Sequence, residues 1–236
     1  MRFDIITLFP ELIQPFLSIG ITRRAFESKQ IDVHLWQLRD YAEGNYKRVD
    51  DRPFGGGPGM VMLPEPLSLC LARILKERQS CPVVLFSPVG KTINQALIET
   101  WSQANGEFGA GAILICGRYE GLDQRFIDAH VTHQFSLGDF VLSGGEIAAV
   151  ALLDAIARLQ PGVLTDEQSH LQDSFNPSIS GLLDCPHYTR PEIWNGMGVP
   201  EVLLSGNHAK IEAWRQMQRL AITQNLRPDI ITAKKL

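Results

Sequence analysis

Two glycine-rich turns near the middle of the chain each follow an apolar run and could hold a small ligand. The first is Leu-Ile-Cys-Gly-Arg-Tyr-Glu-Gly-Leu-Asp at 114–123, and the second is Ser-Leu-Gly-Asp-Phe-Val-Leu-Ser-Gly-Gly-Glu at 136–146. Glycine lets the backbone turn tightly and approach a ligand closely. The pattern therefore favours a nucleoside-like cofactor held by backbone amides and carbonyls.

A third turn, at 87–90, follows another apolar run. In parallel α/β sheets ligands bind at the carboxyl ends of the strands, so the three turns could line one crevice. The alternative is that the glycines only make tight turns. No Gly-x-Gly-x-x-Gly follows the first strand and no Gly-x-x-x-x-Gly-Lys is present, which fits S-adenosylmethionine better than NAD or ATP.

Two polar residues could serve in proton transfer or charge stabilisation, but each also has an ordinary structural explanation. Arg158 falls in the last turn of an apolar helix, where a cation offsets the negative end of the helix dipole. Asp173 lies in the polar stretch Gln-Asp-Ser-Phe-Asn-Pro, where an Asx-turn or a helix cap is common. Residue type alone therefore makes neither of them catalytic.

Strand-like and helix-like segments alternate along the first two thirds of the chain, which predicts an α/β fold with a parallel sheet. An irregular stretch of about twenty residues interrupts them and ends in the glycine-rich segment 53–60, and so long a loop is usually functional or disordered. The expected strands are 3–8, 31–38, 83–86, 112–116 and 131–135, and the expected helices are 11–28 with a break at Gly20, 65–78, 92–103, 120–127 and 146–159.

The helix expected at 146–159 is apolar nearly all round, which predicts burial on every side. In so small a chain, a subunit interface is a reasonable way to bury it. After Pro161-Gly162 the composition becomes polar, and we expect a linker at 161–180 between a domain at 1–160 and a small helical module at 181–236. The longest helix of that module is expected from Asn207 to about Thr223, with four apolar residues on one face: Ile211, Trp214, Met217 and Leu220.

Composition sets broad limits on function. The chain has 236 residues, is 44% hydrophobic and carries a net charge of −4, which argues weakly against a general nucleic-acid coat protein. The scattered cysteines suggest neither a zinc site nor a disulfide framework. No secretory leader or membrane-spanning run is evident, so we expect a cytoplasmic protein. Five cations are candidates for a local basic patch, although a solvated surface explains them equally well: Arg23, Arg24, Lys47, Arg48 and Arg52.

Five motifs in this order resemble the bacterial tRNA (guanine-N1)-methyltransferases, the TrmD family. The resemblance runs from Met1 to about Leu226 and departs slightly at Phe86 and Phe140, where tyrosine is common. The motifs are Pro-Phe-Gly-Gly-Gly-Pro-Gly-Met at 53–60, Cys-Gly-Arg-Tyr-Glu-Gly-Leu-Asp at 116–123, Gly-Asp-Phe-Val-Leu-Ser-Gly-Gly-Glu at 138–146, Gly-Leu-Leu-Asp-Cys-Pro-His-Tyr-Thr-Arg-Pro at 181–191 and Leu-Ser-Gly-Asn-His at 204–208.

The resemblance implies a knotted (SPOUT) α/β methyltransferase domain, with a trefoil knot formed by the three turns, and a small helical C-terminal domain. It also implies a homodimer whose sites are built from both subunits, and a tRNA substrate methylated at guanosine 37, next to the anticodon and preceded by another G. S-adenosylmethionine is the implied cofactor. Mg²⁺ is a candidate ion, but no cluster of metal ligands in the sequence points to it.

The resemblance assigns roles to individual positions. Asp173 falls where the family has its general base, and Arg158 where it has the arginine that supports the reaction. Substrate binding is implied for Gly59, Ser174 and His208. Cofactor binding is implied for Pro88, Gly117, Tyr119, Glu120, Leu137, Gly138, Asp139, Phe140, Val141, Leu142, Gly144 and Gly145.

The chemistry explains why such groups are needed. Guanine N1 is a poor nucleophile while it carries its proton, so a carboxylate must accept that proton. The negative charge then develops toward guanine O6, where an arginine can stabilise it. The base must also leave its stack to reach the cofactor, while the helical module holds the anticodon stem by phosphate contacts, for which the candidates are Lys210, Arg215 and Arg219.

Three other functions compete with this interpretation. A knotted methyltransferase acting on a ribose hydroxyl usually relies on an arginine near the first knot motif rather than on a linker aspartate. A non-catalytic RNA-binding protein with the same fold would not need both Asp173 and Arg158. A nucleotide-binding dehydrogenase would need the glycine fingerprint that is missing.

Overall fold

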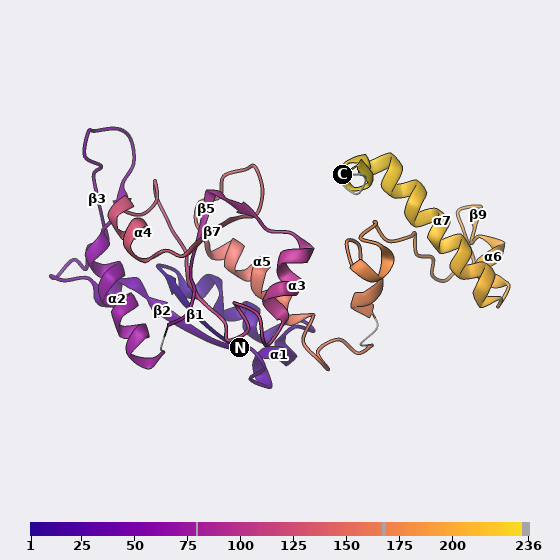
Figure 1. Ribbon diagram of the computed structural model, residues 1–236, viewed down its shortest axis with the longest axis horizontal. Helices are drawn as coiled ribbons and strands as arrows, with labels where there is room; N and C mark the ends of the chain where they lie inside the picture. Colours follow the sequence, from indigo (N-terminus) through magenta and orange to yellow (C-terminus); the bar gives the residue numbers. More distant parts are fainter. Residues whose placement is uncertain (79, 167–168, 233–236) are drawn as a thin grey trace. The chain divides into compact units, whose positions relative to one another are not determined.

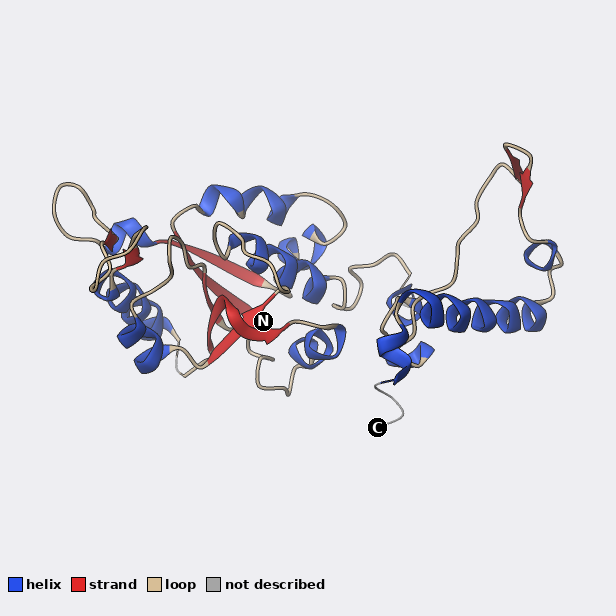
Figure 2. Ribbon diagram, turned by 90° about the horizontal axis from the view of Figure 1, so that it is seen from above, coloured by secondary structure: helices blue, strands red, loops and turns tan. Residues whose placement is uncertain are grey.

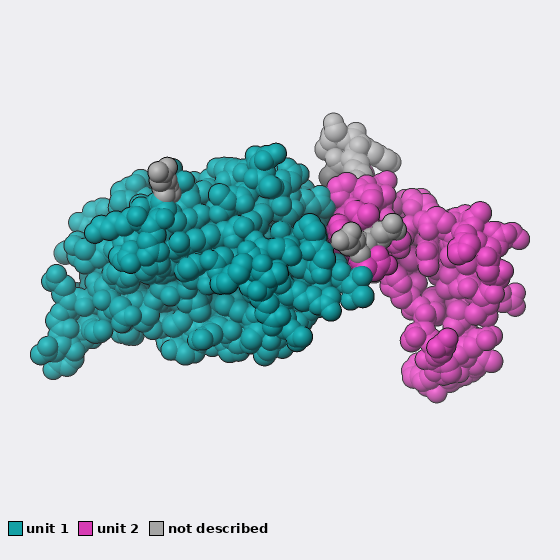
Figure 3. Space-filling model, turned by 90° about the horizontal axis from the view of Figure 1, so that it is seen from below, with its two compact units in different colours: residues 1–165 teal, residues 166–236 magenta. Residues whose placement is uncertain are grey.

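The structure is a computed structural model that describes residues 1–78, 80–166 and 169–232. The chain forms two compact units, Met1–Thr165 and Asp166–Leu236, which Figure 3 colours separately.

A five-stranded sheet forms the centre of the first unit (Figure 1), with the strand order β2-β1-β6-β5-β7. Neighbouring strands are parallel throughout, which confirms the predicted α/β fold with a parallel sheet. The strands are β1 (Arg2–Thr7), β2 (Asp32–Gln37), β5 (Val83–Thr92), β6 (Ile113–Ile115) and β7 (His133–Ser136), and a separate antiparallel pair is formed by β3 (Asp50–Asp51) and β4 (Val61–Met62).

Helices cover both faces of this sheet (Figure 2), because alternate residues of each central strand point to opposite sides. Phe3, Val84 and Leu114 pack with α3 and α5 on one face, whereas Ile6, Leu85 and Ile113 pack with α2 and α4 on the other. The helices are α1 (Arg23–Glu27), α2 (Pro64–Glu77), α3 (Gln95–Ser102), α4 (Gln124–His130) and α5 (Glu146–Ala157), with 3-10 turns at Pro10–Leu12, Gln14–Ser18 and Leu38–Tyr41.

Three predicted elements differ from the structure, each for a local reason. The segment 11–28 forms two 3-10 turns and the short α1, because a proline stands at the first or second position of each turn and Gly20 has φ +74°. Helix α4 begins at Gln124 rather than 120, because the Asp123 side chain caps it by accepting a hydrogen bond from the Arg125 amide. Strand β5 resumes after residues 87–90 and continues to Thr92, so the turn interrupts the strand and does not end it.

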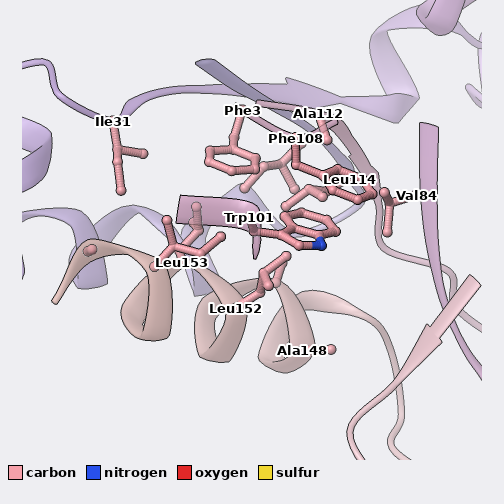
Figure 4. Packing of buried hydrophobic residues seen from close by; sticks show 14 of the residues in the cluster. Phe3, Ile31, Val84, Trp101, Phe108, Ala112, Leu114, Ala148, Leu152 and Leu153 are labelled. Carbon is pink, nitrogen blue, oxygen red and sulfur yellow. The ribbon is translucent and has the colours of Figure 1, made fainter. Parts of the chain in front are cut away.

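Trp101 lies at the centre of the larger core (Figure 4). Its ring stacks on Phe108 with centroids 3.7 Å apart and meets Phe135 edge-on at 5.6 Å. Leu152 of α5 packs in the same cluster. The side chain is fully buried, and its indole N–H has no hydrogen-bond partner among the described residues. It therefore stabilises the unit through packing alone.

Helix α5 is not buried on every side within one chain, and the predicted subunit interface that would cover the rest stays a prediction. Ala148, Ala149, Leu152 and Leu153 face the core, but Ile147 is 55% exposed. Val150 is half-buried and Ala151 is exposed, so an apolar stripe runs along the uncovered face. In the part of the chain that the structure describes, no helix combines the length and apolarity needed to cross a membrane.

The second unit combines helices, 3-10 turns and a short hairpin, and it includes the segment that we expected to be a linker from Asp166 onward. Asn176 and Ile179 are buried within it. Its elements are 3-10 turns at Ser169–Gln172 and Pro177–Ile179, the hairpin strands β8 (Ile193–Trp194) and β9 (Met197–Gly198), and the helices α6 (Glu201–Leu204), α7 (His208–Leu226) and α8 (Pro228–Thr232).

The buried face of α7 differs from the predicted one. Arg219 and Thr223 are buried, whereas Met217 and Leu220 are 62% and 43% exposed. Arg219 forms ion pairs with Glu212 at 2.8 Å and Asp184 at 3.4 Å. It is therefore a structural cation, and its assignment as a phosphate contact was wrong.

Replacing Trp101 with alanine should lower the free energy of unfolding by about 3–5 kcal/mol, because it leaves a large cavity under the sheet. Trp101→Phe should cost clearly less, since it retains a stacking ring and the indole N–H makes no hydrogen bond to lose. Urea unfolding followed by circular dichroism measures both. Equal losses in the two variants would contradict the packing role.

Candidate cofactor site

A cavity of about 580 Å³ opens beside the interruption in β5 and the carboxyl ends of β6 and β7. The three turns named from the sequence form its walls, at 87–90, 117–121 and 136–145. Of the residues predicted to bind cofactor, Gly138 and Asp139 are not part of the lining, although they lie in the third turn. Those that line the cavity are Pro88, Gly117, Tyr119, Glu120, Leu137, Phe140, Val141, Leu142, Gly144 and Gly145.

The first wall arises from an interruption of the β5–β7 ladder. Phe135 pairs with both Phe86 and Lys91, so residues 87–90 loop out between two stretches of parallel pairing. A Cβ atom on Gly90 would lie 2.4 Å from the Phe135 amide nitrogen. A side chain is therefore excluded at the point where the loop rejoins the sheet.

The other two walls touch through their backbones. The Gly145 amide donates a hydrogen bond to the Gly117 carbonyl at 3.0 Å, and Arg118 forms an isolated antiparallel bridge with Gly144. A Cβ atom on Gly145 would lie 2.7 Å from the Cys116 Cα. Glycine is needed there for close approach rather than for a turn, because the φ of Gly145 is −79°.

A buried ionic network lies directly behind this contact. The Glu146 carboxylate accepts a hydrogen bond from the Thr7 hydroxyl at 2.7 Å and forms an ion pair with Arg118 at 2.9 Å. Arg118 also donates to the Ser143 carbonyl and lies over the Phe9 ring. The sequence reasoning assigned no role to Arg118 or Glu146, although a carboxylate that opens an otherwise apolar helix was a usable signal.

Two titratable groups at the walls are perturbed by their surroundings. Burial raises the pKa of the Cys116 thiol well above its usual range, so the thiol stays protonated and belongs to the core. Burial also raises the pKa of Tyr119, and the nearby Asp50 carboxylate adds to this. The tyrosine hydroxyl is therefore a neutral hydrogen-bonding group at neutral pH.

The remaining predicted site residues lie outside the cavity lining. Gly59 adjoins its rim, since a Cβ there would meet the Glu120 side chain at 2.3 Å. Arg158 is the C-cap of α5. Because α5 begins beside the cavity, its rise of 1.5 Å per residue puts Arg158 about 18 Å along the axis from Glu146.

Asp173, Ser174 and His208 belong to the second unit. Asp173 follows the 3-10 turn Ser169–Gln172, and the Ser174 hydroxyl accepts a hydrogen bond from the Asp184 amide at 2.9 Å. His208 is the exposed first residue of α7. Asp173 and Ser174 are consecutive in the sequence. The roles of Asp173, Ser174 and His208 stay predictions.

One group of possible metal ligands was missed in the sequence. The ligand atoms of Asp184, Cys185 and His187 lie within 4.8 Å of one another, and their close spacing at 184–187 was a readable signal. However, Asp184 already accepts hydrogen bonds from the Cys185 amide and from Arg219, and it pairs with His187 at 2.8 Å. These internal partners account for the group without an ion.

Comparison with known proteins identifies the family. The family described as tRNA (Guanine-1)-methyltransferase TrmD matches residues 1–233. The chain belongs to this family. It is 68% identical to the tRNA (guanine-N(1)-)-methyltransferase of Albidiferax ferrireducens over 98% of this chain and 92% of that protein. It is 64% identical to the enzyme of the same name from a Polaromonas species, over 98% of this chain and 89% of that protein.

The cavity suits the cofactor that a TrmD methyltransferase implies, S-adenosylmethionine. Its volume of about 580 Å³ falls within the range of small-molecule sites. The lining combines close backbone at Gly117, Gly144 and Gly145 with the apolar side chains of Leu137 and Leu142. Such a lining provides amides, carbonyls and apolar contacts for a nucleoside without a phosphate clamp.

Replacing Gly145 with alanine should weaken S-adenosylmethionine binding by about tenfold or more, because the added methyl group must push the two turns apart, and overpacking of this kind costs about 1–3 kcal/mol. Isothermal titration calorimetry measures the affinity. The matched control is Gly198→Ala, where a Cβ meets nothing within 4 Å. Unchanged affinity in Gly145→Ala would contradict the role of the backbone contact.

Proposed function

We propose that the protein transfers a methyl group from S-adenosylmethionine to N1 of guanosine 37 in tRNAs that carry G at position 36. The observation that supports this most is the cavity walled by the family's own three turns, in a chain that matches the tRNA (Guanine-1)-methyltransferase family over residues 1–233. Two curated relatives that share more than 60% of their residues with it carry the name of that activity.

Asp173 is proposed as the general base and Arg158 as the group that stabilises the developing charge. The base would remove the N1 proton and leave a lone pair on N1 free to accept the methyl group. The bond from that methyl group to sulfur would break in the same step, and S-adenosylhomocysteine would leave. The arginine donates hydrogen bonds to O6 as negative charge accumulates there. When bound, S-adenosylmethionine supplies an electrophilic methyl group, so the protein's own task is deprotonation and alignment.

The place of Arg158 supports a site built from two subunits. One end of α5 borders the cavity at Gly145, whereas Arg158 caps the other end, about 18 Å away along the helix axis. An arginine side chain is much shorter than this distance and cannot reach the cavity of its own chain. A second copy of the chain would have to bring Arg158 to the guanine.

The uncovered stripe of α5 supports the same arrangement. Ile147, Val150 and Ala151 are the exposed or half-buried apolar residues of that face, and contiguous apolar surface of this kind marks an interaction site. In a two-fold dimer the same patch meets itself. If two α5 helices pack antiparallel, the Arg158 end of one lies beside the cavity end of the other.

The other expectations follow as parts of the same proposal. Residues 1–160 hold the cofactor, and the turns at 87–90, 117–121 and 136–145 form the trefoil knot. From Asp166 onward the segment that we expected to be a linker belongs to the same unit as residues 181–236, which bind the anticodon stem-loop. Gly59, Ser174 and His208 contact the substrate, and the exposed Lys210 and half-buried Arg215 are the remaining candidates for phosphate contacts. Mg²⁺ stays a candidate ion.

Methyl transfer from labelled S-adenosylmethionine to an unmodified tRNA with G at positions 36 and 37 tests the function. The wild type should place the label on N1 of guanosine 37, and Asp173→Asn should be slower by about a hundred- to ten-thousandfold with cofactor affinity unchanged. Asp229→Asn is the matched control, because Asp229 is an exposed carboxylate of the same unit that pairs with Arg227. Label on a ribose would favour the competing knotted methyltransferase.

Mixed dimers test the shared site. A subunit with Arg158→Ala keeps an intact cavity, and a subunit with Gly145→Val keeps an intact Arg158. Each homodimer should be nearly inactive. Co-expression and random pairing should restore roughly a quarter of the wild-type rate, since half of the dimers are mixed and each holds one whole site. No gain over the parents would show that each subunit uses its own Arg158.

A further inference from the structure

We propose that Glu146 is a positioning residue for cofactor binding, which holds Arg118 in the cavity wall and neutralises its charge toward a cationic cofactor. The inference deepens the proposed function and rests on it in one respect, which is that the cofactor is S-adenosylmethionine. Glu146 does not line the cavity, whereas Arg118 does. Any influence of this carboxylate on the cofactor must therefore act through its neighbours.

Glu146 joins three segments that are far apart in the sequence. It is the first residue of α5 and is only 1% exposed. One carboxylate oxygen accepts from Thr7, the last residue of β1, at 2.7 Å. The other lies 2.9 Å from a guanidinium nitrogen of Arg118, in the turn after β6. The carboxylate thus fastens the end of a central strand to two walls of the cavity.

The Thr7 hydroxyl is held in the orientation that this contact needs. It accepts a hydrogen bond from the Phe9 amide at 2.9 Å, which leaves its proton directed at Glu146. Arg118 lies with its guanidinium 4.5 Å from the Phe9 ring centroid. Phe9 therefore contacts the network twice, once through its amide and once through its ring.

The burial of Glu146 requires the charge of Arg118. A buried carboxylate is costly unless it is paired and hydrogen-bonded. The positive end of the α5 dipole, the Thr7 hydroxyl and Arg118 together meet that cost. Neither Arg118 Nε nor the Glu146 oxygen that faces Arg118 has a hydrogen-bond partner among the described residues, so the two side chains are held together as an ion pair.

The pairing has a consequence for the ligand. S-adenosylmethionine carries a positive sulfonium, whereas its product S-adenosylhomocysteine has a neutral sulfur at the same place. An unpaired guanidinium in the wall would repel the first and not the second. With Glu146 behind it, the Arg118 side chain forms a nearly neutral pair that tolerates a cation. The device therefore favours the substrate cofactor relative to the product.

Calorimetric titration with both cofactors tests this inference. In Glu146→Gln the dissociation constant of S-adenosylmethionine should rise about three- to tenfold more than that of S-adenosylhomocysteine, because Arg118 keeps its charge and loses its partner. The double variant Arg118→Met/Glu146→Gln removes both charges, a change that proteins often tolerate. It should return the ratio of the two constants toward the wild-type value.

Asp4→Asn provides the matched control. Like Glu146, Asp4 is a buried carboxylate, but it lies on β1. It pairs with Arg2 at 2.7 Å and Arg78 at 3.0 Å, and none of these three residues lines the cavity. It should lower stability and leave the cofactor ratio unchanged.

The outcomes separate the inference from the proposed function. Wild-type protein that binds neither cofactor would overturn the cofactor assignment and the inference with it. If the wild type binds both, equal weakening of the two by Glu146→Gln would mean a purely structural brace and would overturn the inference alone. The inference would also be overturned if the double variant kept the same altered ratio of the two dissociation constants as Glu146→Gln, since no unpaired cation would remain in the double variant. A restored ratio supports it.

Discussion

The contact between the turns after β6 and before α5 constrains the rest of the first unit. The Gly145 amide reaches the Gly117 carbonyl at 3.0 Å, and a Cβ on Gly145 would lie 2.7 Å from the Cys116 Cα. Backbones this close leave no room for side chains between them, so both turns keep bare amides and carbonyls at their surface. The cavity can offer backbone groups to a ligand because the fold requires glycine there.

Buried carboxylates are paired with arginines near both ends of β1, but with different consequences. Near the amino end, Asp4 is surrounded by Arg2, Arg78 and the indole N–H of Trp36, and none of these lines the cavity. At the carboxyl end, Glu146 reaches Thr7 and a single arginine that does line it. The same type of pair is structural at one end and faces the ligand at the other, because only the carboxyl ends of parallel strands border a site.

Much of this architecture was predictable from local pattern, since short apolar or alternating runs placed β1, β2, β6 and β7 to within a few residues of their observed bounds. Long-range contacts were not predictable in this way. The start of α4 depends on a side-chain cap by Asp123, and the burial of Arg219 depends on Glu212 and Asp184. Glu146 was read only as the start of an apolar helix, because its partners lie 28 and 139 residues away.

Helix α5 shows how one segment can appear misassigned when one chain is considered alone. Its composition predicts burial all round, yet Ile147 and Ala151 remain exposed in the single chain. Both observations agree if a second chain covers that face. The same helix separates the cavity from Arg158 by its full length. A second chain that packs on the apolar stripe of α5 would therefore also bring Arg158 to the cavity of the neighbouring chain. An apolar interface and a completed site would then be consequences of one packing arrangement.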